Sequence, residues 1–96
     1  MEGNGTTKAP SAKSLLHAFQ ISVVDDRPVM FDYWNDSVNK ECFIGVKEDQ
    51  EKLLVKSEDE YTSTIAKIFK VEDEYIILTE NSLYVVSAEI PTRRVS

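Results

Sequence analysis

Three apolar runs near the C-terminus constrain the fold of this chain more than any other feature. The runs cover residues 67–71, 75–79 and 83–87, and only the polar breaks 72–74 and 80–82 separate them. Runs of β-branched and aromatic residues bounded by acidic, Asn or Ser residues are typical of strands joined by tight turns. The pattern therefore predicts a β-meander, but it indicates no particular chemistry.

Residues 14–24 fit two interpretations, because Phe19 belongs both to an apolar helical face and to an alternating apolar pattern. We predict a short helical turn that leads into a strand at about residues 19–24. The polar sequence 25–28 is then a turn, in which the proline holds the preceding arginine extended. Residues 29–34 would return as the second strand of a hairpin.

A second hairpin is predicted from residues 41–46 and 52–56, which flank a polar break. Residues 57–71 fit two alternatives. Ser57 and Glu60 match a capping box, which indicates a helix. The run Thr62-Ser63-Thr64-Ile65 prefers a strand, and we favour the strand.

These elements predict a mainly β fold, either a small antiparallel barrel or a two-layer sandwich of about six or seven short strands. If residues 57–71 were helical, the fold would be α+β. Residues 1–13 contain no Leu, Ile, Val or aromatic side chain, so we expect a disordered arm. Residues 14–90 should form a single compact domain. Residues 91–96 begin with a proline, which cannot donate to a sheet, and are expected to be a short tail.

The charge of the chain excludes some classes of function. The 96 residues carry a formal charge of −6, which repels phosphate backbones and disfavours direct nucleic-acid binding. The same charge fits an acidic decoy that occupies a nucleic-acid-binding protein. The single cysteine, Cys42, excludes an intramolecular disulfide and favours a reducing, cytoplasmic setting. With no long apolar run and no signal-peptide pattern, we expect neither membrane insertion nor export.

The segment from Asp25 to Asp36 is the strongest candidate for a binding surface, since it combines four carboxylates, one arginine and the only tryptophan. A Trp beside a Tyr among hydrogen-bonding groups is typical of recognition surfaces. Consecutive strand residues face opposite sides, so we expect one ring to be buried and the other, Trp34, to be exposed. The competing interpretation is that an aromatic ring closes the core and the aspartates decorate turns. The candidate binding residues are Asp25, Asp26, Arg27, Asp32, Tyr33, Trp34 and Asp36.

No catalytic or metal-binding pattern stands out. The spacing of these aspartates does not match a calcium loop, and one His and one Cys cannot supply a zinc ligand set. His17 and Cys42 lack an accompanying oxyanion-stabilising glycine loop, so we expect Cys42 to fill the core and His17 to be partly exposed. The acidic triplets 58–60 and 72–74 are expected to be solvated turns. No cofactor is predicted.

The sequence Ile77-Leu78-Thr79 followed by Leu83-Tyr84-Val85 resembles a late hairpin of pleckstrin-homology and related domains. The resemblance covers about a tenth of the chain and implies peptide or lipid binding. The chain departs from the family pattern, because no closing helix fits after Glu89 and the early turn offers only Arg27 as a basic residue.

Taken together, these features predict a non-catalytic, intracellular module that binds another protein and has no enzymatic activity. A homo-oligomer is compatible with the sequence. The alternatives are the acidic decoy, a pleckstrin-homology-like peptide- or lipid-binding domain and, third, an enzyme.

Overall fold

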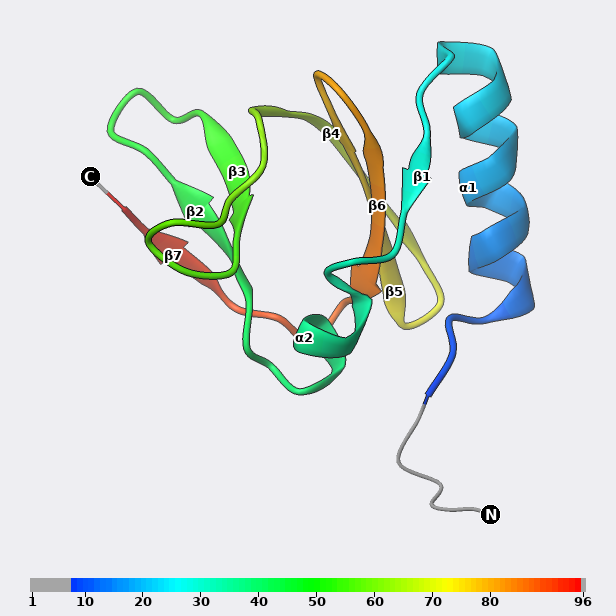
Figure 1. The fold of residues 1–96 in the computed structure, drawn as a ribbon, viewed down its shortest axis with the longest axis horizontal. Helices are drawn as coiled ribbons and strands as arrows, with labels where there is room; N and C mark the ends of the chain where they lie inside the picture. The colour runs from blue at the N-terminus through cyan, green and yellow to red at the C-terminus, as the bar shows by residue number, and fades with distance from the viewer. Residues whose placement is uncertain (1–7, 96) are drawn as a thin grey trace.

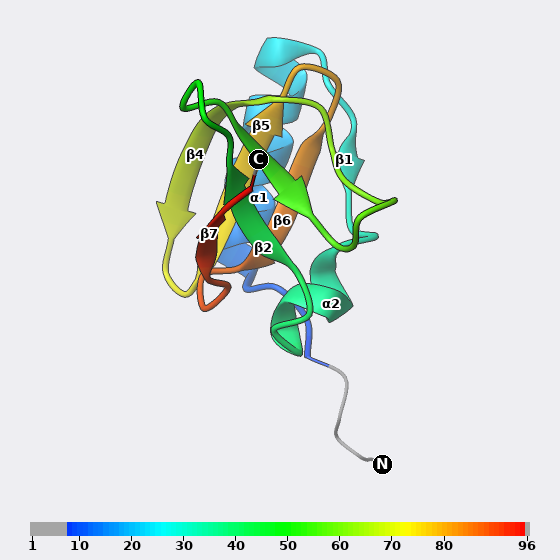
Figure 2. The same ribbon diagram turned by 90° about the vertical axis from the view of Figure 1, so that its left-hand side faces the viewer.

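The protein folds into three layers, a helix, a large sheet and a small sheet. A computed structural model describes residues 8–95, so most of the predicted N-terminal arm, residues 1–7, lies outside the described residues. Helix α1 (Ala12–Asp25) covers one face of the large sheet, and the small sheet covers the other face (Figure 1). Figure 2 shows the small sheet in front, the large sheet behind it and α1 at the back. The short helix α2 (Trp34–Val38) lies at one end of the two sheets.

The described residues contain seven short strands, as predicted. The large sheet has the order β1-β6-β5-β4 and the small sheet the order β3-β2-β7. The meander and the second hairpin are confirmed. Of residues 57–71, favoured as a strand, only residues 65–71 form one, and residues 57–64 are a loop with an isolated bridge at Tyr61. The bounds are β1 (Val29–Met30), β2 (Phe43–Val46), β3 (Lys52–Val55), β4 (Ile65–Val71), β5 (Glu74–Thr79), β6 (Leu83–Ser87) and β7 (Thr92–Arg94).

Residues 12–25 form one continuous helix, so the predicted strand at residues 19–24 is wrong. Ser11 caps the helix, because its Oγ accepts a hydrogen bond from the backbone N of Ser14 at 3.1 Å. Ser14 and Ala18 are fully buried, and their small side chains let the helix lie close to β5 and β6. Capping and packing thus override the strand preference of the β-branched residues in the second half of α1.

Two strand pairs are parallel, so the expectation of a purely antiparallel sheet is wrong. β1 pairs with β6 through Val29 and Leu83, and β2 pairs with β7 through Ile44 and Thr92. Both pairs join segments that are far apart in the sequence, which connection lengths between neighbouring strands do not reveal. Within residues 8–95 the strands form two separate sheets rather than a closed barrel.

The C-terminal residues 92–94, predicted to belong to a tail, form the edge strand β7. Pro91 cannot donate a hydrogen bond, but its carbonyl accepts one from the backbone N of Ile44 at 2.9 Å. The backbone N of Val95 donates to the carbonyl of Val46 at 2.8 Å. The proline therefore directly precedes an edge strand, and its carbonyl takes part in the pairing with β2.

The central strands of the large sheet, β5 and β6, are buried on both faces, which explains why they are nearly continuous apolar runs. The edge strand β4 is only partly buried. One hydrophobic core, here called the intersheet core, lies between the two sheets; the other, the helix core, includes Ala18 of α1. The buried residues of the intersheet core are Tyr33, Cys42, Ile44, Leu54, Ile77, Val86 and Ile90. Those of the helix core are Ala18, Trp34, Ile76, Leu78, Leu83 and Val85.

Candidate binding surfaces

The predicted binding segment is divided between two ends of the molecule. Asp25, Asp26 and Arg27 end α1, whereas residues 32–36 lie in and beside α2. Strand β1 separates the two groups, and Figure 1 shows them at opposite ends of that strand. The structure therefore does not bring the predicted residues together into one site.

Arg27 fastens the end of α1 to the large sheet. Asp26 takes a left-handed conformation (φ 54°), and its backbone N–H donates to the carbonyl of Ser22, which ends the helix. The Arg27 guanidinium donates to the carbonyl of Asp25 at 2.9 Å and to the carbonyl of Glu80 at 3.1 Å. Arg27 thus supports the turn between β5 and β6, while the carboxylates of Asp25 and Asp26 are exposed.

Tyr33 and Trp34 are both buried, with 5% and 6% of their surfaces exposed, so the expectation that Trp34 faces outward is wrong. Only Val29–Met30 of the predicted strand 29–34 is a strand, and Tyr33 adopts a turn conformation before α2. Strand alternation therefore does not apply to the pair. The Trp34 indole N–H donates to the carbonyl of Lys8 at 2.6 Å, so its polar atom is satisfied inside the fold.

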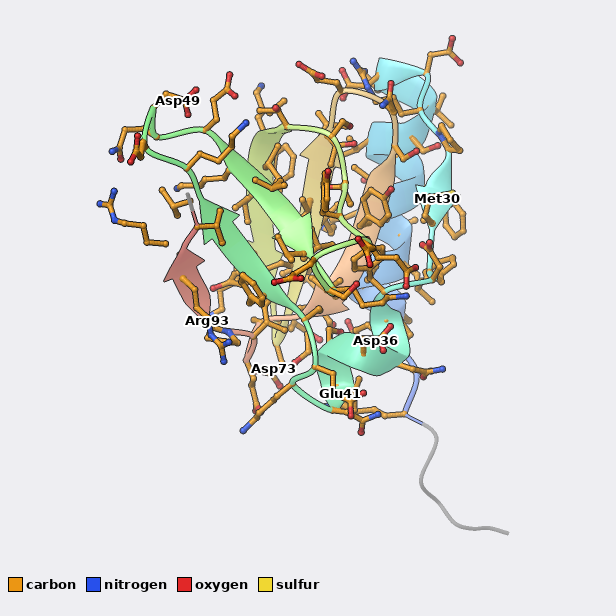
Figure 3. All side chains as sticks on the ribbon, turned by 60° about the vertical axis from the view of Figure 1, so that its left-hand side comes forward. Met30, Asp36, Glu41, Asp49, Asp73 and Arg93 are labelled. Atoms are coloured by element: carbon orange, nitrogen blue, oxygen red, sulfur yellow. The ribbon has the colours of Figure 1, made fainter. Side chains whose placement is uncertain are left out.

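Lys56 contacts three residues in and just before α2, namely Asp32, Tyr33 and Asp36. Its ammonium lies 3.1 Å from a carboxylate oxygen of Asp36 and 4.6 Å from the centre of the Tyr33 ring, and it donates to the carbonyl of Asp32 at 3.3 Å. Figure 3 shows Asp36 on α2. The hydrogen bond to Asp36 raises the pKa of Lys56, which outweighs its desolvation. This cluster ties the loop after β3 to α2.

The titratable groups near Lys56 are unsuited to nucleophilic chemistry. Burial, followed by the nearby Asp36 charge, raises the pKa of the Cys42 thiol to about 11, which opposes thiolate formation. Burial and the neighbouring Tyr84 raise the pKa of Tyr33 to about 12. Cys42 is 1% exposed, which confirms that it fills the core. Among residues 8–95 no three His, Cys, Asp or Glu side chains are grouped as metal ligands would be.

An exposed apolar stripe runs along α1, on the side opposite the large sheet. It consists of Leu16, Phe19 and Val23, and Val24 flanks it. The buried residues Ser14 and Ala18 project toward the sheet, roughly half a turn of the helix away. The stripe is strongly exposed, since 59% of Leu16 and 82% of Val23 are accessible. A helix on the surface of a domain normally presents polar side chains to solvent and buries its large apolar ones. The apolar stripe on the solvent side of α1 is therefore unusual.

The stripe could have been found from the sequence, because Ala12, Leu16, Phe19 and Val23 follow the alternating four- and three-residue spacing of a coiled-coil seam. A strand at residues 19–24 would hide this spacing, because it places Phe19 and Val23 on the same face as Ile21. Their alternation of Phe19, Ile21 and Val23 was misleading: Ile21 packs against the helix core, whereas the other two belong to the exposed side.

A second apolar surface is a groove of about 690 Å³ in the small sheet. Phe43 and Val55 are cross-strand partners in its floor, and Gly45 leaves room there for Val95. Arg93 stacks over Phe43 with its guanidinium 5.0 Å from the ring centre. The groove is lined by Phe43, Lys47, Leu53, Val55, Ser57, Glu58, Tyr61 and Val95.

The groove and the stripe lie on different sides of the molecule. In Figure 3, Arg93 marks the far edge of the small sheet, and Met30 marks β1, which contacts α1. The large sheet separates the two regions. The molecule therefore offers two candidate contact surfaces that single substitutions can distinguish.

Comparison with known proteins supplies no relative for this chain: no family model, no curated protein and no solved structure matches it. The resemblance to pleckstrin-homology domains thus rests on the hairpin residues alone, and residues 90–95 contain β7 rather than a closing helix. Within residues 8–95 no helix is long and apolar enough to cross a membrane.

Proposed function

We propose that this chain is a non-catalytic protein-binding module and that the stripe on α1 is its contact surface. The observation that carries the proposal is the outward orientation of Leu16, Phe19 and Val23 on a helix already packed on its opposite side. Contiguous exposed apolar surface on a small domain is typical of interaction sites.

The exposed carboxylates of Asp25 and Asp26 follow the stripe at the end of α1 and would border the contact. Of the predicted binding residues, Asp25 and Asp26 are the ones that lie beside this surface. Tyr33 and Trp34 are buried in the two cores and are therefore not part of this contact surface.

The test is affinity capture with purified tagged protein, followed by mass spectrometry, using the wild type, Val23→Glu and Tyr61→Glu. Tyr61 lines the groove and is 59% exposed, so its replacement adds the same charge on another surface. We expect proteins captured by the wild type and by Tyr61→Glu to be lost with Val23→Glu. Capture that depends on Tyr61 instead would assign binding to the groove. The acidic decoy stays a prediction, to be checked by competition with DNA for a bound nucleic-acid-binding protein.

A further inference from the structure

We propose that the partner of the α1 stripe is a second copy of this chain, an inference that rests on the proposed function. Two copies would pack their α1 helices against each other through Leu16, Phe19 and Val23 and form a symmetric dimer. The spacing of these residues is that of a helix-pairing seam.

The distribution of charge favours this occupant. The sequence contains no Asp or Glu between Glu2 and Asp25, whereas all the other acidic residues lie from Asp25 onward. A chain of formal charge −6 repels its copies over most of its surface, whereas α1 up to Val24 carries no acidic residue that would add to this repulsion. A basic partner would find carboxylates only at the C-terminal end of the stripe, where Asp25 and Asp26 lie, and would meet Lys13 near its other end. A second copy supplies an equally uncharged apolar face.

The size of the face predicts the strength of association. The 14-residue helix is about 21 Å long, and paired helices lie about 8–10 Å apart. Contact limited to one helix from each copy is at the low end of specific interfaces, so we expect a weak dimer with a dissociation constant of roughly 1 to 100 µM. Such a dimer should be visible as a change of mass with concentration.

The direction of the salt dependence separates this apolar dimer from a charge-driven contact. Salt screens the repulsion between two acidic chains over a length of about 10 Å at 0.1 M. Association through the stripe should therefore strengthen, or stay unchanged, as sodium chloride rises from about 0.05 to about 0.5 M. Association that weakens tenfold or more over this range would contradict the proposal.

Sedimentation velocity over protein concentrations from about 1 µM to about 1 mM provides the test. We expect the wild type to change from monomer to dimer across this range, and Leu16→Glu and Val23→Glu to associate at least tenfold more weakly. Both replacements introduce a good helix former at an exposed position, so the variants should fold. Circular dichroism and thermal melts would verify this.

Tyr61→Glu is the matched control, since Leu16 and Tyr61 are both 59% exposed and each change adds one negative charge. We expect this variant to dimerise like the wild type. A wild type that stays monomeric up to about 1 mM, or a dimer that survives both stripe variants, would overturn the inference. If such a monomer still captured other proteins through Val23, the proposed function would stand and only the second copy would be rejected.

Discussion

Tyr33 and Trp34 are neighbours in the sequence but pack into the two separate cores on opposite faces of the large sheet. Tyr33 belongs to the intersheet core, where its ring meets Tyr84 edge to face at 5.4 Å. Trp34 belongs to the helix core with Ala18. The turn before α2 therefore anchors the chain on both sides of the sheet at once.

We expect Tyr33→Ala and Trp34→Ala each to lower the free energy of unfolding by about 3–5 kcal/mol, because each removes a buried aromatic ring. Denaturant titration followed by circular dichroism measures both losses, and it suits the Trp34 variant, which lacks the only tryptophan. Phe31→Ala is a control, since that aromatic residue is exposed. A loss below ~1 kcal/mol for either buried residue would contradict its place in a core.

Ile77 and Val85 test the two cores separately, since Ile77 lies in the intersheet core and Val85 in the helix core, both fully buried. We expect Ile77→Ala to cost about 2–5 kcal/mol and Val85→Ala somewhat less. Denaturant titration of the single variants measures this. A change in unfolding free energy near zero for Ile77→Ala alone would indicate that the small sheet does not pack on the large sheet. The same result for Val85→Ala alone would indicate this for α1.

The contact between Ser14 and Glu74 makes the attachment of α1 dependent on pH. The Ser14 hydroxyl donates to a carboxylate oxygen of Glu74 at 2.6 Å, and Glu74 is buried. Burial opposes ionisation of Glu74, but hydrogen bonds from Ser14 and Ser11 outweigh it and hold its pKa below the ordinary 4.5. The expectation that the whole triplet 72–74 is a solvated turn is therefore wrong for Glu74.

Because the folded pKa is the lower one, this contact contributes stability that is fully present above pH 4.5 and is lost as the pH falls through the folded value. We expect Glu74→Gln to be less stable than the wild type by about 1–3 kcal/mol at pH 7, and the difference to shrink below pH 4.5. Unfolding titrations from pH 7 to pH 3 measure the difference. Glu72→Gln, in the same turn but exposed, is the control. A difference that stays constant with pH would exclude a role for the charge.

Cys42 should react with thiol reagents only after unfolding, because it is buried and its thiol pKa is raised to about 11. The rate at which Cys42 reacts is measured at pH 8, with and without denaturant, from the absorbance of the thiol that a chromogenic disulfide reagent releases. We expect a rate at least a hundredfold lower in the native protein, in line with exposure that requires global opening. Rapid native reaction would show that the chain around Cys42 opens locally.

The local sequence determined the elements whose partners lie next to them in the chain. The meander β4-β5-β6 and the hairpin β2-β3 follow from apolar runs separated by short polar breaks, since antiparallel neighbours need only a tight turn. Burial of Cys42 followed from residue type. The number of strands agrees with the prediction only because two errors cancel: the predicted strand at residues 19–24 is helical, and β7 was expected to be a tail.

Tertiary contacts decided the rest. The strand-like pattern of residues 19–24 became helical because small residues on α1 meet the large sheet and Ser11 caps the helix. The register shift between Ile65 and Lys67 places Ile65 and Phe69 against different cores, although their even spacing predicts one face. The parallel pairs and the division of Asp25–Asp36 between two ends of β1 depend on residues far apart in the sequence, whose pairing is set by packing energy and not by local preference.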